Sequence, residues 1–505
     1  MPEYMGGSGR PPSPPTLRAP RHSRGALRQR NSFAGPEQPG PVLLYGGLTR
    51  AHHACIKGAL ESLGYRAEPL PVPDNRDLAL GRQYGNRGWC NPAYYTVGSL
   101  VRYLEARRAA GEARPAERYA FLTVSSCGPC RFGMYADAYR KAFRETGLDG
   151  VPIVLIDQVG GLEQDAGARW VRLDHRFFVR VVRALMLADL LNELAARTRP
   201  YEVRAGATDQ ALDGALGLAE VALSRRGPIG RLLRGVRDLF DQVAVDPLQV
   251  KPVVKVTGEF WAQTTEGDGN YRLRTWLESE GAEVRMEPVT AWIDYLIWLG
   301  LDYVRARAGL RPREGGVGLA RTVGLVVGLR LAQTLVRTAY ARYRRLLGAR
   351  PDPLPPQHLL ARYARPYYCP DLRGGEGHAE VGKHIHAFAH RQAHLVLSVK
   401  PFGCMPSTMS DGTQYKVMED YPGSLFLPVE TTGDGEASVK SRIQMALFEA
   451  RARARQEFEA VLAARGIALA EARRLAARRG LARATARLPR RWAGTAANVV
   501  EALHA

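Results

Sequence analysis

The stretch YAFLTVSSCGPCRFGMYADAYRKAF, from Tyr119 to Phe143, places an apolar run directly before two cysteines and a helical segment. The run Tyr119–Val124 predicts a buried strand that ends just before Cys127 and Cys130. Residues 41–47 and 151–157 are similar apolar runs, and residues 49–65 show the apolar spacing of a helix. Strands that alternate with helices indicate a parallel sheet, so residues 41–185 are predicted to form an α/β domain.

Residues 251–450 show the same alternation, with strands expected within 251–261, 393–407 and 424–431. Residues 186–250 are predicted to form a helical connector between the two halves. A helical, Arg-rich insertion is expected at about 291–365, and an Ala/Arg-rich helical extension over 451–505. The sequence therefore predicts an α/β fold: two Rossmann-like parallel-sheet domains with a helical insertion and a helical C-terminal extension.

The basic residues gather outside the segments that contain the cysteine motifs. Of the formal net charge of +21, all is accounted for by six Arg against two Glu in residues 1–40, eleven Arg against two acidic residues in 301–350, and twelve Arg against four Glu in 451–505. Such segments suit an acidic partner, RNA, a membrane surface or simply a solvated face. We favour the solvated face and expect no specific nucleic-acid partner. Residues 1–40, rich in Pro, Gly, Ser and Arg, are predicted to be a disordered basic tail.

No uninterrupted apolar run of about 18 residues occurs, so we expect no membrane span. The most apolar helical stretch, residues 318–336, contains Arg321 and Arg330, which favours a buried or partner-facing helix. The N-terminal residues contain neither an apolar signal-peptide core nor a twin arginine, and a cytoplasmic location is the expectation.

Six cysteines occur, and in a large chain without an export signal they favour metal or redox chemistry over disulfides. Cys55 lies beside the apolar face of a predicted helix and is predicted to be a packed core thiol. The other cysteines lie in loops with Gly or Pro close by: Cys90, Cys127, Cys130, Cys369 and Cys404.

Four interpretations of these loop cysteines compete. A thioredoxin-like Cys-x-x-Cys explains Cys127 and Cys130 but not Cys90 and Cys404. A structural zinc site usually has two such pairs, and only one is present. Unrelated buried thiols are the third interpretation. An iron–sulfur cluster is favoured, because Gly permits close backbone approach, Pro restricts the loops, and helix starts stabilise thiolates.

Two other patterns are weaker. Gly-Asp-Gly precedes a predicted helix at residues 267–269 and again at 433–435, but neither stretch is a phosphate-binding loop or a full dinucleotide fingerprint. His386, His390 and His394 fall on one face of a predicted helix. Without an accompanying carboxylate pattern, a polar or core-edge helix is favoured over a metal site.

Long phrases of the chain resemble a known family. The phrases are GNRGWCNPAYYTVGSLVRYLE, SSCGPCRFGMYADAYRKAF, TGEFWAQTTEGDGNYRLRTWLESEGAEV, KPFGCMPSTMSDG and ETTGDGEASVKSRIQMALFEA. They are similar to (R)-2-hydroxyglutaryl-CoA dehydratase D-component-like proteins, including the related regions of acyl-CoA dehydratase activases. The resemblance covers roughly residues 41–300 and 366–450.

The resemblance implies Rossmann-like domains around a [4Fe-4S] cluster held by three cysteines from separate loops, with one iron open. It implies a lyase that dehydrates a 2-hydroxyacyl-CoA through a ketyl radical, using one electron from a separate ATP-dependent activator protein. By position, it implies Cys90, Cys404 and one or both of Cys127 and Cys130 as ligands. The chain lacks the activator's own phosphate loops, so ATP hydrolysis is not assigned to it. We expect a dimer, formed with itself or with a distinct subunit.

The chain departs from a three-cysteine pattern, because Cys369 adds a further candidate ligand. Full ligation of the cluster favours electron transfer over substrate binding. The alternative function is therefore a non-catalytic iron–sulfur electron-transfer or accessory protein. A scaffold with structural cysteines, whose basic segments bind an acidic partner, is the third hypothesis.

Overall fold

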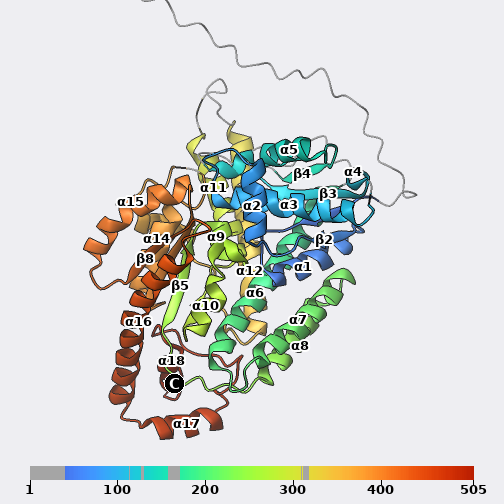
Figure 1. Cartoon of the computed structure of the whole chain (residues 1–505). Coiled ribbons are helices and arrows are strands. Elements are labelled where there is room, and N and C mark those ends of the chain that lie inside the picture. The colour runs from blue at the N-terminus through green and yellow to red at the C-terminus, as the bar shows by residue number, and fades with distance from the viewer. Residues whose placement is uncertain are drawn as a thin grey trace, which may run out of the picture. The chain divides into compact units, whose positions relative to one another are not determined.

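The strands of the first half form one parallel sheet, as their alternation with helices predicts. The computed structural model describes residues 40–112, 114–126, 130–156, 171–308, 310, 318–372 and 374–504. The first sheet has the order β2–β1–β3–β4 (Figure 1). Its strands are β1 (Val42–Tyr45), β2 (Ala67–Pro69), β3 (Tyr119–Val124) and β4 (Ile153–Ile156). All three strand pairings are parallel.

Helices cover both faces of this sheet. Successive side chains of a strand point to opposite faces, so Leu43 and Leu44 of β1 enter different cores. Leu44 packs with residues of α3 (Asn91–Ala109) and α5 (Tyr135–Thr146). Leu43 packs with residues of α1 (Arg50–Glu61) and with Phe177 at the start of α6 (His175–Thr198). Burial on both faces explains why these strands are continuous apolar runs.

The second half contains a second four-stranded sheet, with the order β6–β5–β7–β8, and it is also wholly parallel. Its strands are β5 (Val253–Gly258), β6 (Glu283–Arg285), β7 (Leu395–Pro401) and β8 (Phe426–Thr431). One core of this sheet contains α10 (Leu273–Ser279) and the first half of α16 (Glu436–Arg465). Helix α14 (His378–Ala389) contacts β5 and β7.

The remaining helices surround the two sheets (Figure 1). Those of the first half and the connector are α2 (Asn75–Tyr84), α4 (Pro115–Arg118), η1 (Arg131–Met134), η3 (Arg199–Tyr201), α7 (Ala207–Ser224) and α8 (Ile229–Asp241). Those of the second half are α9 (Phe260–Thr264), η4 (Asp268–Asn270), α11 (Val289–Ala306), α12 (Leu319–Leu346), α13 (Gln357–Ala364), α15 (Met405–Asp420), α17 (Leu469–Arg478) and α18 (Thr495–Ala502).

The α/β class, the helical insertion and most strands agree with the sequence prediction. Strand β2 was not predicted, because three residues are too few to show a period. The extension is not continuous helix: residues 479–494, between α17 and α18, contain none. Residues 40–505 form one compact unit, and the domain boundaries drawn within it stay predictions. The predicted disordered tail, residues 1–39, lies outside the described part of the chain.

Helix α12 differs from the buried helix that its composition favours. Of its residues, only Thr322, Gln333 and Tyr340 are buried within the described structure. Leu319, Val327 and other apolar side chains are exposed. Among the described helices it alone is long and apolar enough to cross a membrane by length and composition. That measure is weak for a single helix, and a partner-facing role for α12 stays a prediction.

Candidate functional site

Cys404 lies where β7 ends and α15 begins, at the carboxyl edge of the second sheet. It is the N-cap residue of α15, and Pro406 stands in the first turn of that helix. Gly403 has φ +79°, a conformation that glycine adopts without strain, and this turns the chain sharply into the helix. The Cys404 thiol is buried and donates to the Ser407 hydroxyl at 3.3 Å.

Cys90 occupies the same kind of position in the first half. It is the N-cap residue of α3, with Pro92 in the first turn of that helix. Its thiol is buried and lies 2.9 Å from the Tyr135 hydroxyl of α5. The first N–H groups of an α-helix have no partner within it, so both thiols lie at helix ends that favour anions.

The Cys90 and Cys404 loops touch each other. The Asn91 N–H donates to the Phe402 carbonyl at 3.2 Å, and the Asn91 side chain donates to the Thr431 carbonyl at 2.7 Å. A Cβ placed on Gly403 would lie 3.4 Å from the Cα of Cys90. The carboxyl ends of β7 and β8 are therefore joined by hydrogen bonds to the start of α3, where parallel sheets usually bind ligands.

The loop after β3 reaches the same place. Cys130 is half-buried and is the N-cap residue of η1. The next residue, Arg131, donates to the Gly88 carbonyl of the Cys90 loop. A Cβ on Gly403 would also lie 3.0 Å from the Arg131 guanidinium. Cys127 lies outside the described residues, so the structure says nothing of its place.

Three carboxyl groups, none of them predicted as site residues, gather beside the thiols. Glu259 follows β5 directly, and its carboxylate accepts from the Ala262 N–H at 2.8 Å. Burial, and then the neighbouring Glu380, raise the pKa of Glu259 to about 7. Burial raises the pKa of Glu376 well above its ordinary value, and Glu259 and Glu380 raise it further. The carboxyl of Glu380 accepts from the Ser407 hydroxyl at 2.7 Å.

These carboxyl groups and the thiols influence each other's protonation. Burial, with a smaller contribution from the Glu259 carboxylate, raises the pKa of Cys90 and Cys404 and raises that of Cys130 to about 11. The thiols are therefore protonated at neutral pH in the protein without metal. Because a metal ligand must be a thiolate, metal binding at this place would release protons.

The remaining cysteines are placed differently. Cys369 is exposed in the loop after α13, and among the described residues its thiol forms no hydrogen bond with Cys90, Cys130 or Cys404. Cys55 is fully buried among residues of α1, α6 and α7, as predicted for a core thiol. No three His, Cys, Asp or Glu side chains among the described residues form a group ready to hold a metal ion. The loops that contain Cys90, Cys130 and Cys404 nevertheless meet.

The histidines predicted to share one helical face do not all lie on a helix. Helix α14 ends at Ala389, so His390 is its C-cap, and His394 stands just before β7. The His394 ring accepts from the Val253 N–H at 2.9 Å. His384 is fully buried, stacks on Phe426 with ring centroids 4.4 Å apart, and lies 2.8 Å from the Gln414 side chain.

The burial of His384 predicts acid sensitivity. Burial lowers its pKa to about 4, below the unfolded value of 6.5, so the unfolded chain binds the extra proton more readily. This histidine should therefore favour unfolding progressively as the pH falls from 6.5 to 4. Because of this histidine, the free energy of unfolding should be about 2 kcal/mol lower at pH 5 than at pH 7.

Urea unfolding of the wild type and of His384→Gln at pH 7 and pH 5 measures this contribution. The variant should lose about 2 kcal/mol less than the wild type on going to pH 5. His358 is exposed, and His358→Gln is the matched control, which should keep the wild-type pH dependence. Equal pH dependence in all three proteins would contradict the argument.

In comparisons with known proteins, no protein-family model matches the chain, and no curated protein matches it.

Proposed function

We propose that the chain is an iron–sulfur protein of the 2-hydroxyacyl-CoA dehydratase class, with a [4Fe-4S] cluster between two Rossmann-like halves. The observation that best supports this is the meeting of the Cys90, Cys130 and Cys404 loops where β3 and β7 end. In the proposal, Cys90, Cys404 and one or both of Cys127 and Cys130 hold the cluster. Thiolates are the usual ligands of such clusters.

The donor set fits this group in its chemistry. Cys90, Cys130 and Cys404 each stand at a helix start, where unpaired N–H groups stabilise anionic sulfur. One Glu376 carboxyl oxygen nearby, Oε1, is buried without a hydrogen-bond partner among the described residues. Unpaired buried polar atoms are costly and rare, so their presence is consistent with a group that belongs there.

A bound cluster supplies one electron and, where one iron is open, a Lewis acid for a carbonyl oxygen. The protein's own carboxyl groups are suited to proton transfer, because burial raises the pKa of Glu259 to about 7. We propose that the acid form of Glu259 gives its proton to the departing substrate hydroxyl, which leaves as water, and that Glu259 becomes a carboxylate. In this proposal the substrate is an acyl-CoA, a separate ATP-dependent activator protein supplies the electron, and the protein acts as a cytoplasmic dimer.

The alternative is a non-catalytic electron-transfer or accessory protein, and the Cys127–Cys130 pair favours it if both thiols bind iron. Anaerobic reconstitution of Cys127→Ser and Cys130→Ser, followed by iron and sulfide assay and EPR, distinguishes the two. Loss of the cluster in one variant only supports three-cysteine ligation and an open iron. Loss in both supports the alternative.

Reconstituted wild-type protein should be brown and should contain iron and sulfide. A colourless preparation that contains zinc would remove both proposals. In the catalytic proposal, addition of a 2-hydroxyacyl-CoA should shift the EPR spectrum of the reduced protein. An unchanged spectrum would leave only electron transfer.

A further inference from the structure

A cavity of about 470 Å³ lies between the second sheet, the end of the insertion and the C-terminal extension. Its walls come from β5, β6 and α14, from residues 349–359, and from residues 488–498. Its volume falls in the usual range of small-molecule sites, about 300–1,000 Å³. None of the cysteines or site carboxyl groups described above lines it.

The lining of this cavity is strongly cationic. Only two carboxylates line it, Glu287 and Asp352. The cations that line it are Arg197, Lys255, Arg285, Arg350, Lys383, Arg391 and Arg490. Burial lowers the pKa of the lining His386 to about 4, so that ring adds no charge at neutral pH. Positive charge therefore exceeds negative charge at the walls.

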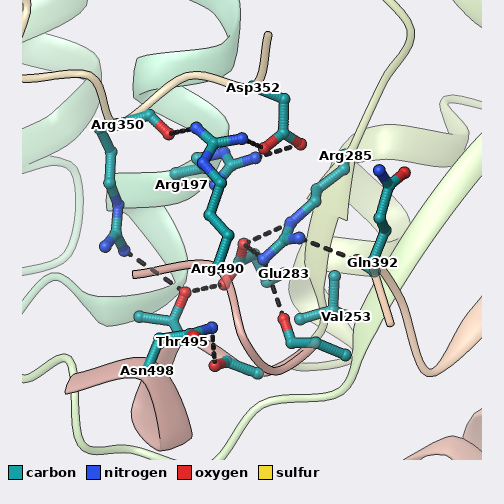
Figure 2. Close-up of polar contacts among 12 residues, drawn as sticks. Arg197, Val253, Glu283, Arg285, Arg350, Asp352, Gln392, Arg490, Thr495 and Asn498 are labelled. Atoms are coloured by element: carbon teal, nitrogen blue, oxygen red, sulfur yellow. Dashed lines mark hydrogen bonds and ion pairs between the residues drawn. The ribbon is translucent and has the colours of Figure 1, made fainter. Parts of the chain in front are cut away.

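Most of these cations have partners (Figure 2). Arg197 and Arg490 both pair with Asp352. Arg285 pairs with Glu283 at 2.9 Å, and outside the view of Figure 2 Lys255 pairs with Glu287 at 3.1 Å. Charges that are paired in this way are neutralised within the protein and do not call for a ligand.

Arg350 is the first exception. Its side chain is only 7% exposed, yet its one hydrogen bond within the described structure is a long one, 3.4 Å, to the Thr495 hydroxyl. Its Nε has no partner, and no described carboxylate forms an ion pair with it. Burial, and repulsion from Arg197 and Arg285, lower the pKa of Arg350 to about 10, although Glu283 opposes this.

Lys383 is the second exception. It is 9% exposed on α14, and it has no hydrogen bond or ion pair with the described residues. Neither cation forms a direct ion pair with a described carboxylate, and two such buried cations at one cavity favour an anionic ligand. Carboxylates act on them only at longer range: Glu283 on Arg350, and Glu287, Glu376 and Glu380 on Lys383. A guanidinium and an ammonium together match the charge and oxygen atoms of a phosphate group.

Part of the cavity wall is apolar. Trp492, with Arg391 5.0 Å from its ring centroid, lines the cavity together with leucine and proline side chains. Those side chains are Pro353, Leu354, Pro355, Pro356, Leu359, Leu488 and Pro489. Such a wall suits an organic group rather than an inorganic ion alone. We propose that the cavity binds a small organic phosphate, with the phosphate held by Arg350 and Lys383.

This site is independent of the proposed cluster. Its occupant would join the end of the insertion to α14, because Arg350 and Lys383 come from these two segments. The source of the phosphate group is open to test: a nucleotide and coenzyme A both contain it. Binding can be measured on the full chain without iron, so failure of one proposal leaves the other standing.

Isothermal titration calorimetry with pyrophosphate, adenosine diphosphate and coenzyme A tests the site, with adenosine as the phosphate-free control. At least one organic phosphate should bind more tightly than pyrophosphate, and adenosine should not bind. A preference for coenzyme A over adenosine diphosphate would identify a thioester carrier as the natural class. Failure of all three phosphates to bind would overturn the proposal.

Arg350→Met and Lys383→Met should each weaken phosphate binding about tenfold or more. Arg321→Met removes the same charge from an exposed position on α12 and should leave the affinity unchanged. Equal weakening in all three variants would mean general attraction to a basic chain and would overturn the site. Without phosphate, Arg350→Met should melt no lower than the wild type, and added ligand should no longer raise its melting temperature.

Discussion

Cys404→Ser is expected to abolish binding of the proposed [4Fe-4S] cluster. Cys404 is buried at the start of α15, and its loop is fixed against the Cys90 loop through Asn91 and Gly403. A serine hydroxyl does not replace a thiolate as a strong cluster ligand. After anaerobic reconstitution, the iron and sulfide content of the variant should fall to the background of protein treated without sulfide.

Cys369→Ser is the matched control, because the same replacement is made at an exposed thiol. It should retain the wild-type iron content and EPR spectrum. The melting temperature of Cys404→Ser without iron should stay close to that of the wild type, which separates loss of a ligand from loss of the fold. Full iron content in Cys404→Ser would exclude this cysteine as a ligand, and loss in Cys369→Ser would add that thiol to the set.

Gly258→Ala is expected to destabilise the protein by about 4 kcal/mol or more, an exceptional cost for one substitution. Gly258 has φ +113°, where an L residue is strained. A Cβ there would lie 2.6 Å from the Val399 nitrogen and closer still to its carbonyl oxygen. Val399 is the partner of Gly258 in the β5–β7 ladder, so neither backbone can move without breaking the pairing.

Gly281→Ala separates the cost of backbone strain from the cost of the contact with Val399. Gly281 also has positive φ, +84°, but a Cβ there would meet no atom within 4 Å. That variant should lose about 1–2 kcal/mol of stability, the cost of the backbone strain alone. Urea unfolding measures both values. Equal losses would mean that the contact with Val399 contributes nothing.

The sequence predicts the strands of the two sheets more fully than the site formed by the cysteine loops. Strand β3 has the predicted bounds, because Tyr119–Val124 is an apolar run buried on both faces. The loop cysteines could be listed because Gly and Pro neighbours mark turns. The favoured cluster also implied that these loops meet. The Asn91 bonds between the halves, which bring the loops together, could not be predicted. Glu259 followed a predicted strand and offered a signal; Glu376 and Glu380 showed no pattern that distinguishes them from surface acids.

The cationic cavity at Arg350 and Lys383 could not be predicted from the sequence. Arg350 belongs to a segment that composition marks as a basic, solvated insertion, yet the structure buries it. Its guanidinium lies 3.4 Å from the Thr495 hydroxyl, which is far away in the chain. Charge counts identify a basic segment, but they do not say which of its cations face inward.

The contacts of β6 give the C-terminal extension a protective role. This strand is at the edge of the second sheet, yet all three of its residues are buried. Arg285 donates to the Ala493 carbonyl at 3.0 Å, and the Thr495 hydroxyl donates to Glu283 at 2.5 Å. An uncovered edge strand invites pairing with another chain. The start of α18 and the loop before it therefore pack on the side chains of β6, and none of the three residues of this edge strand is left exposed.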